Sequence, residues 1–367
     1  MKLLELCTSR GVGGLELYAL RCASRLSAAG LDVLAVLRAD SFLHRRAQEQ
    51  GIAHATLPRR SRHLPLIAAR RLARLIERHA IDVIHMHWGE DLLLAALAKR
   101  WARRPLRLIY TRQMELTRAK KDAYHRFLYH PIDRYLTITD RLLAQAQTYL
   151  PLPAARMQRL YLGAPAPDAA PDDAARRALR RRLNIPDGHF AVGLIGRMEE
   201  NKGQHLLIEA VRQLRAQGTA IHATLIGPVM DAGYAQRLQQ TIARHELGAA
   251  LTLHGAHPAP MAIMPAFDAV ALTTRAETFG LVLIEAMRCG VAVIGSNAGG
   301  VPEIIEHEHS GLLFQSGDAA QLAAQLQRLS AAPDFCRQLA TSGKLRADRL
   351  FDETNHFRQL ADILQNH

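Results

Sequence analysis

The sequence is poor in cysteine and has no long hydrophobic run. Its four cysteines are scattered and include no CxxC pair, which argues against a disulfide framework or a zinc site and favours reduced, mostly buried thiols. They are Cys7, Cys22, Cys289 and Cys336. The longest apolar runs, such as Leu92–Ala98, fall far short of the roughly 20 residues that a membrane-spanning helix needs. Charged residues near the N-terminus, Glu5 and Arg10, leave no room for the apolar core of a signal peptide. We therefore expect a cytosolic protein.

Glycine and proline are not abundant either. The 24 glycines and 16 prolines among 367 residues exclude a collagen-like or proline-rich architecture. Hydrophobic residues make up 49% of the chain and charged residues 22%, which is typical of a globular protein and excludes wholesale disorder. A chain of this length fits two domains of about 150–200 residues each.

Acidic residues are scarce in the first half of the chain. Residues 1–165 hold 28 lysines and arginines against 13 acids, a net of +15, and the remaining residues hold 19 against 21, a net of −2. The densest basic patches are Arg59–Arg62, Arg70–Arg74 and Lys99–Arg104. A basic surface suits nucleic acid, anionic lipid headgroups or a phosphorylated substrate, and a solvated arginine-rich surface without a function stays open. Because no nucleic-acid-binding motif accompanies the charge, we expect no nucleic-acid partner.

Short aliphatic runs alternate with amphipathic stretches of helical length. The sequence shows no strict fixed-period repeat. The runs predict strands at residues 2–7, 32–37, 53–57, 83–87, 106–111, 134–138 and 157–161 and, after a break, at 190–195, 220–226, 251–254, 269–272, 291–294 and 311–314. The break at residues 163–174 is rich in proline and alanine and predicts an interdomain linker. The pattern predicts two doubly wound α/β domains with parallel sheets that face each other across a cleft, with ligands outside the carboxyl ends of the strands.

A glycine-rich loop, Gly11–Gly14, follows the first strand and opens a helix. The dinucleotide-binding fingerprint GxGxxG requires a third glycine where this chain has Glu16, which argues against a nicotinamide cofactor. Small residues at this turn would let main-chain N–H groups approach an anion such as a phosphate. A tight turn without a ligand is the alternative.

Three further motifs follow strands of the second half. In Gly196–Gly203, Arg197 and Lys202 stand five positions apart and could grip a diphosphate. In Glu277–Ala286, we expect a helix that starts near Thr278 and whose first N–H groups form an anion site. In Ser296–Glu303, two glycines allow a turn with positive φ, and a proline suits the first turn of a short helix.

The order of these motifs resembles glycosyltransferase family 4, a large family of retaining enzymes with the GT-B fold, over nearly the whole chain. The resemblance implies an acceptor-side Rossmann-like domain at 1–165, onto which 351–367 would pack back as a C-terminal helix, and a nucleotide-sugar-binding Rossmann-like domain at 166–350. It implies no cofactor and no metal. The residues that it assigns to the donor are Gly13, Gly14, Gly196, Arg197, Lys202, Gly255, Ala256, Glu277, Thr278, Phe279, Gly280, Leu281 and Glu285.

The resemblance also implies roles for these residues. Arg197 and Lys202 would hold the diphosphate, and main chain at Phe279–Leu281 would face the phosphate and the sugar. Glu285 would bind the ribose hydroxyls, and Glu277 would lie beside the sugar ring. Gly13 and Gly14 would close on the phosphate, and main chain near Gly255 and Ala256 would meet the base. The residues that would take part in catalysis are Arg197, Lys202, Glu277 and Gln113.

One position departs from the family pattern. Many relatives have a histidine after the fifth strand, where this chain has Arg112 and then Gln113. A glutamine can hydrogen-bond a sugar hydroxyl but cannot take a proton, so a histidine base is in doubt, and Arg112 is a further candidate substrate contact. His85 and His87 share one face of the fourth predicted strand, and His87 could reach the cleft. Two ligands are too few for a metal site there.

We therefore expect a retaining glycosyltransferase that uses a UDP- or GDP-linked sugar. The basic first half suits an anionic acceptor at the inner membrane surface, such as a lipopolysaccharide core or a lipid-linked saccharide. A GT-B nucleotide-sugar epimerase or a sugar phosphorylase is the alternative enzyme. A basic protein that binds membrane or nucleic acid is the alternative without catalysis, and it leaves Glu277 and Glu285 without a role.

Overall fold

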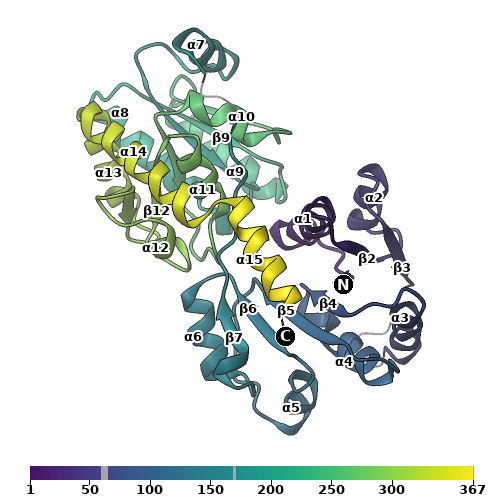
Figure 1. Ribbon diagram of the computed structural model, residues 1–367. Coiled ribbons are helices and arrows are strands. Elements are labelled where there is room, and N and C mark those ends of the chain that lie inside the picture. The colour runs from purple at the N-terminus through teal and green to yellow at the C-terminus, as the bar shows by residue number, and fades with distance from the viewer. Residues whose placement is uncertain (59–64, 168–170, 367) are drawn as a thin grey trace. The chain divides into compact units, whose positions relative to one another are not determined.

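The computed structural model describes residues 1–58, 65–167 and 171–366 of the chain. Contacts divide the chain into two units, a first unit of Met1–Tyr161 with Asn355–His367 and a second unit of Leu162–Thr354 (Figure 1). The sequence predicts that the chain passes from one domain to the other near residues 165 and 351. The contacts place these boundaries after Tyr161 and after Thr354.

The first unit is built on a seven-stranded parallel sheet in the order β3-β2-β1-β4-β5-β6-β7. The strands are β1 (Lys2–Cys7), β2 (Asp32–Arg38), β3 (His54–Leu57), β4 (Val83–Met86), β5 (Arg107–Arg112), β6 (Arg134–Thr137) and β7 (Met157–Arg159). The helices are α1 (Gly14–Ala28), α2 (Phe42–Glu49), α3 (Leu66–Arg78), α4 (Leu92–Trp101), α5 (Ala123–Tyr129), α6 (Asp140–Tyr149) and, from Asn355 onward, α15 (Glu353–Gln365). Every residue of β1 after Lys2 is buried, because helices cover both faces of a parallel sheet.

The terminal helix α15 returns to the first unit, as predicted. The Arg107 guanidinium at the start of β5 donates to the Leu364 carbonyl at 2.9 Å, and the Tyr18 hydroxyl of α1 donates to Nε2 of His356 at 2.9 Å. These contacts join the last helix to the central strands and to the first helix of the unit.

The second unit is built on a six-stranded parallel sheet in the order β10-β9-β8-β11-β12-β13. The strands are β8 (Phe190–Ile195), β9 (Ile221–Ile226), β10 (Leu251–His254), β11 (Ala269–Leu272), β12 (Ala292–Ser296) and β13 (Leu312–Phe314). The helices are α7 (Asp173–Arg182), α8 (Gln204–Ala216), α9 (Ala232–Arg244), α10 (Pro260–Ile263), α11 (Leu281–Arg288), α12 (Val301–Ile304), α13 (Ala319–Ala331) and α14 (Pro333–Leu350). Aliphatic side chains from α8, α13 and α14 pack with the strands in one core.

Each strand predicted from the sequence is present, and no strand end differs from its predicted position by more than two residues. The predicted linker is wrong at its end, because α7 already begins at Asp173, where the Asp172 carboxylate caps the helix by accepting from the Ala175 N–H. Residues 168–170 of that linker and the basic patch Arg59–Arg62 lie outside the described residues. Among the described helices, none combines the length and the apolar character needed to span a bilayer.

Candidate donor-binding site

The loop after β8 lies against the end of β11. It contains a short 3₁₀ turn at Glu200–Lys202 and then Gly203, whose φ of +67° favours glycine. A Cβ on Gly203 would lie 2.3 Å from the Thr273 carbonyl oxygen, and the Thr273 hydroxyl donates to the Lys202 carbonyl at 2.8 Å. The glycine therefore allows the close approach that holds Lys202 at the carboxyl end of the sheet.

The loops after β11 and β12 also touch each other. Gly299 has a φ of +62°, and a Cβ there would lie 1.9 Å from the Glu277 carbonyl oxygen. The Gly300 N–H donates to that same oxygen at 2.8 Å. The Ser296 hydroxyl at the end of β12 donates to the Thr274 carbonyl at 2.6 Å. The third predicted motif thus supports the second, a function that the sequence alone did not reveal.

An ion pair links the first two motifs. Nζ of Lys202 lies 2.9 Å from Oε2 of Glu277, and the two side chains are 21% and 19% exposed. Arg197 is 43% exposed and pairs with Glu199 at 2.9 Å. The sequence predicts both cations, but not that each already has a carboxylate partner. The predicted diphosphate contact of Arg197 and Lys202 stays a prediction, and it would compete with Glu199 and Glu277.

The helix of the second motif starts later than predicted. Gly280, with a φ of +104°, is the N-cap, and α11 begins at Leu281 rather than near Thr278. A helix N-terminus carries partial positive charge and attracts anions. Glu285 lies one turn inside α11 and is half-buried, while Phe279 is buried. The exposed main chain at Gly255 and Ala256 follows β10, the edge strand of this sheet.

In the first unit, the glycine-rich loop holds a carboxylate of the chain itself. The Ser9 hydroxyl donates to Oε1 of Glu16 at 2.5 Å, and a Cβ on Gly11 would lie 2.6 Å from the same oxygen. A Cβ on Gly13 would lie 3.2 Å from Oε2 of Glu16. Gly14 begins α1. The sequence suggests a phosphate or an empty turn at this loop, and the structure adds Glu16 as an occupant. The phosphate contact at Gly13 and Gly14 stays a prediction.

Gln113 and Arg112 differ in how their side chains are satisfied. Gln113 is buried directly after β5, and its Nε2 has no hydrogen-bond partner among the described residues. Arg112 donates to the Tyr110 hydroxyl at 2.9 Å and to the carbonyls of Met114 and Glu115 at 2.7 and 2.9 Å. An unpartnered buried amide donor can bind a polar ligand atom, whereas Arg112 is held by the protein itself.

His87 does not reach the surface. It is 0% exposed, and its Nε2–H donates to Oε2 of Glu5 at 2.6 Å. His85 is buried beside it and bonds through Nδ1 to Oε1 of Glu5 at 3.0 Å. The sequence predicts only two possible metal ligands here, and that number is wrong, because Glu5 and Cys22 also lie in this cluster. Glu5 could have been flagged as the single acid in the apolar strand 2–7.

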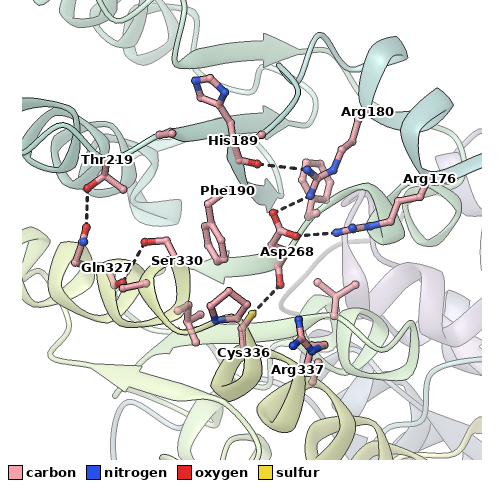
Figure 2. Close-up of a pocket in the computed structure, with 18 of the residues that line it drawn as sticks. Arg176, Arg180, His189, Phe190, Thr219, Asp268, Gln327, Ser330, Cys336 and Arg337 are labelled. Carbon is pink, nitrogen blue, oxygen red and sulfur yellow. Dashed lines mark hydrogen bonds and ion pairs between the residues drawn. The ribbon is translucent and has the colours of Figure 1, made fainter. Parts of the chain in front are cut away.

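A cavity of about 870 Å³ lies at the amino-terminal ends of the strands of the second sheet (Figure 2). Its lining includes Phe190 at the start of β8 and Asp268 just before β11. Arg176 and Arg180 each lie 2.7 Å from an oxygen of Asp268, so these charges are paired within the protein. Ligands of parallel sheets bind at the carboxyl ends of strands, and this cavity is at the other end.

Comparison with known proteins supplies the family. Residues 175–346 match the family "Glycosyl transferases group 1", and residues 12–166 match the family "Glycosyltransferase Family 4". The chain belongs to glycosyltransferase family 4. The family 4 resemblance predicted from the motif order is confirmed.

Two relatives place this glycosyltransferase among sugar-transferring proteins. It is 28% identical over 300 residues to the amylovoran biosynthesis glycosyltransferase AmsK of Erwinia amylovora, covering 78% of this chain and 70% of the relative. It is 24% identical over 398 residues to the D-inositol 3-phosphate glycosyltransferase of a Nocardioides species, covering 96% of this chain and 84% of the relative.

Solved structures confirm the GT-B fold. Anabaena Alr3699/HepE in complex with UDP has a TM-score of 0.85 at 24% identity, covering 100% of both chains. The same protein has been solved with UDP-glucose, with a TM-score of 0.82 over 100% of both chains.

Proposed function

We propose that this glycosyltransferase moves a sugar from a UDP- or GDP-sugar to a hydroxyl of an anionic, membrane-associated acceptor, with retention of the anomeric configuration. The observation that carries the proposal is the meeting of Lys202, Glu277 and Gly299 at the carboxyl end of the second sheet. The UDP and UDP-glucose bound by Anabaena HepE support a nucleotide-sugar donor.

The chemistry that we propose follows from charge. As the bond between sugar and diphosphate breaks, negative charge builds on the leaving phosphate. Arg197, Lys202 and the N-terminus of α11 would stabilise that charge, so the donor would need no metal ion. The acceptor hydroxyl would attack from the face that the diphosphate leaves, and its proton would pass to the leaving phosphate. Gln113 would donate its unpartnered amide N–H to a sugar hydroxyl.

We assign the acceptor to the first unit because of its charge and its pocket. A cavity of about 400 Å³ follows β4 and β5, and its lining includes Trp88, Arg112, Lys120 and Tyr124. Burial and the nearby Arg112 lower the pKa of Lys120. Cations beside exposed aromatic surface suit an acceptor that carries both phosphate and an apolar part, such as a lipopolysaccharide core or a lipid-linked saccharide. The name of the Nocardioides relative includes a phosphorylated acceptor, which supports this class.

A thermal-shift screen with UDP-, GDP- and ADP-sugars tests the donor. A ligand at 100 times its Kd stabilises the fold by about 2.7 kcal/mol, so the true donor should raise the melting temperature clearly. Lys202→Ala should lose that shift. A protein that responds to none of these donors would contradict the proposal. The anomeric configuration of the product, measured by NMR, tests retention, and an epimerised donor without acceptor would instead indicate the epimerase.

Vesicle binding tests the membrane partner at the cytoplasmic face of the inner membrane. Of the predicted basic patches, Lys99 and Arg104 form ion pairs with Asp133 and Asp82. The exposed cations of this region are a better target for charge reversal. They are Arg71, Arg74, Arg100 and Arg103. Each Lys or Arg near an anionic surface contributes about 1 kcal/mol, so changing all four to Glu should abolish sedimentation with anionic vesicles.

The matched control reverses four exposed arginines of the second unit. They are Arg177, Arg181, Arg215 and Arg244. This control has the same change in net charge and should still bind vesicles. Equal partition of the wild type to neutral and anionic vesicles, or to neither, would remove the membrane partner and leave a soluble acceptor.

A further inference from the structure

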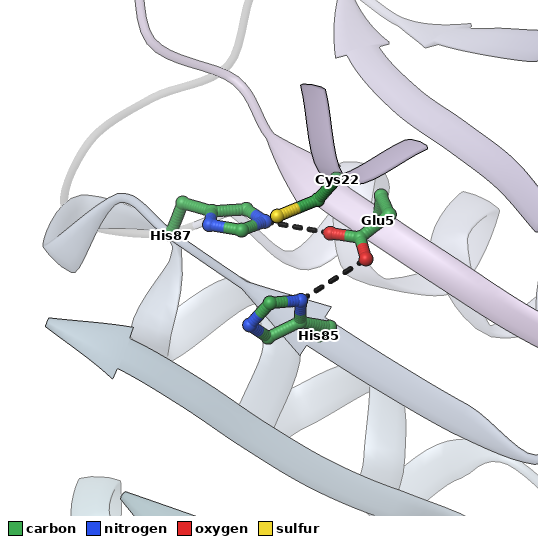
Figure 3. Close-up of side chains that lie close together, drawn as sticks. All are labelled: Glu5, Cys22, His85 and His87. Carbon is green, nitrogen blue, oxygen red and sulfur yellow. Dashed lines mark hydrogen bonds and ion pairs between the residues drawn. The ribbon is translucent and has the colours of Figure 1, made fainter. Parts of the chain in front are cut away.

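Four side chains that commonly bind metals gather inside the first unit (Figure 3). Glu5 comes from β1, His85 and His87 from β4 and the residue after it, and Cys22 from α1. One potential ligand atom of each lies within 4.8 Å of the others, and all four side chains are buried. This cluster takes no part in the glycosyl transfer proposed above.

The fold explains why these residues meet. β1 and β4 are adjacent parallel strands, and Glu5 is in register with His85. Side chains two positions apart share one face of a strand, so His85 and His87 both lie on one side of β4. Helix α1 covers that side and brings in Cys22, which Figure 3 shows beside Glu5 and His87.

The negative charge of the buried Glu5 carboxylate would be compensated by a bound cation. In the part of the chain that the structure describes, the hydrogen-bond partners of the Glu5 carboxylate are His85 and His87, and neither is a lysine or an arginine. Two neutral imidazoles can each donate one N–H to Glu5, but they leave its negative charge uncompensated in a dry interior, which is costly. A divalent cation with one carboxylate, one thiolate and two neutral imidazoles makes a centre of zero net charge.

The ligand types select the metal. Nitrogen and sulfur ligands with one carboxylate suit Zn²⁺, whereas Ca²⁺ and Mg²⁺ require mostly oxygen. Bonds of about 2.0–2.3 Å in a tetrahedron place ligand atoms about 3.3–3.8 Å apart. The atoms of His85 and His87 now lie 3.0 and 2.6 Å from Glu5, so small side-chain shifts would open the space.

The surroundings of His85 match those of a metal-bound histidine. Its Nε2 lies 2.7 Å from the Thr111 hydroxyl oxygen on β5. A histidine that binds metal through one nitrogen usually has the other fixed by such a partner. When Nδ1 binds the metal, the ring N–H moves to Nε2 and donates to Thr111.

We propose that Glu5, Cys22, His85 and His87 bind one zinc ion that ties β1, β4 and α1 together. The ligand atoms are one Glu5 oxygen, Sγ of Cys22, Nδ1 of His85 and Nε2 of His87. Four protein ligands leave no open position, so the ion is structural rather than catalytic. Binding releases the Cys22 thiol proton, and the metal takes the place of the hydrogen bonds between Glu5 and the two imidazoles.

Metal analysis of the full chain tests this site without any assay of glycosyl transfer. The protein is made without a histidine tag in zinc-supplemented medium, dialysed against metal-free buffer and analysed by mass spectrometry of the elements. We expect about one zinc per chain in the wild type and less than roughly one-tenth in Cys22→Ser. Cys336→Ser removes a buried thiol of the second unit and should keep the wild-type zinc content.

A second measurement needs no variant and covers the case in which Cys22→Ser does not fold. Cobalt added to the metal-free wild type should produce the intense thiolate-to-cobalt absorption and the visible bands of a tetrahedral site. Zinc added afterwards should remove both. A folded wild type that retains no zinc and gives no thiolate band with cobalt overturns the proposal. Equal zinc in wild type and Cys22→Ser overturns it as well.

Discussion

Two glutamates, one in each unit, are held in opposite ways. Glu5 on the central strand β1 is 2% exposed and lies between two buried histidines. Glu277, after β11, is 19% exposed and pairs with a single lysine at the carboxyl end of its sheet. Removing a sealed acid destabilises the fold, because its buried partners are then left without a hydrogen-bond partner and out of reach of water. A partly exposed acid can exchange its partner for a ligand. If the proposed donor site is correct, the two units use the same kind of residue differently: Glu5 supports the first sheet, and Glu277 takes part in binding.

The largest expected effect is the loss of stability when the buried Glu5 is removed. Glu5→Ala leaves His85 and His87 without their shared acceptor, and removing one partner of a buried pair costs about 3–5 kcal/mol of unfolding free energy. Urea unfolding followed by circular dichroism measures this cost. The exposed Glu49→Ala in the same unit is the control and should change stability by less than about 1 kcal/mol. Equal losses for the two variants would break the comparison.

A second buried group of the first unit predicts a pH effect on stability. Burial, with smaller contributions from Arg21 and His85, lowers the pKa of His356 to about 4. Its Nδ1–H donates to the Tyr161 carbonyl at 2.6 Å, and its Nε2 accepts from Tyr18, so the folded protein holds the neutral ring.

The sign of that effect follows from proton binding. Between pH 6.5 and 4, the unfolded state binds a proton that the folded state does not, so stability is present above pH 6.5 and falls as the pH decreases. The full loss is about 3 kcal/mol. Melting temperatures of the wild type and of His356→Gln, measured from pH 7 to pH 4, should converge as the pH falls. Parallel curves would rule out this role for His356.

The partly exposed ion pairs of the proposed donor site should affect activity rather than stability. Lys202→Ala or Arg197→Ala removes a charge-assisted contact to the diphosphate and should lower kcat/KM by an amount that corresponds to about 2–4 kcal/mol. Melting temperatures should change little, because both residues lie on a loop. Lys344→Ala, which removes another cation paired with an acid in the same unit, should leave the rates unchanged. Wild-type turnover by both site variants would refute the donor site.

The smallest effects should separate the two acids of the proposed donor site. Glu285→Ala, the proposed loss of a ribose contact, should raise the KM for donor at least as much as it lowers kcat. Glu277→Ala should mainly lower kcat, since we propose that it lies beside the reacting sugar. Steady-state kinetics with varied donor distinguishes the two outcomes. The reverse pattern would exchange the two assignments.

The sequence was sufficient for the strands, because buried parallel strands are short apolar runs with clear ends, as at Phe190–Ile195. Its motifs also singled out Lys202, Glu277 and Gly299, which the structure brings together, while their roles in the site stay predictions. It could not reveal that Glu277 pairs with Lys202, since that contact joins loops 75 positions apart. Glu16 and Cys22 were missed for the same reason, because their surroundings depend on how α1 packs rather than on neighbours in the chain.

The return of α15 has a consequence for how the protein is made. Residues 162–354 form a continuous unit that a ribosome completes before the partners of Tyr18 and Arg107 have been synthesised. During translation, the first unit therefore remains incomplete while the second unit emerges and folds, and the surface that binds its last helix stays uncovered. Chaperone demand during translation should concentrate on that interval. A chain truncated before Asn355 would leave this surface of the first unit uncovered permanently.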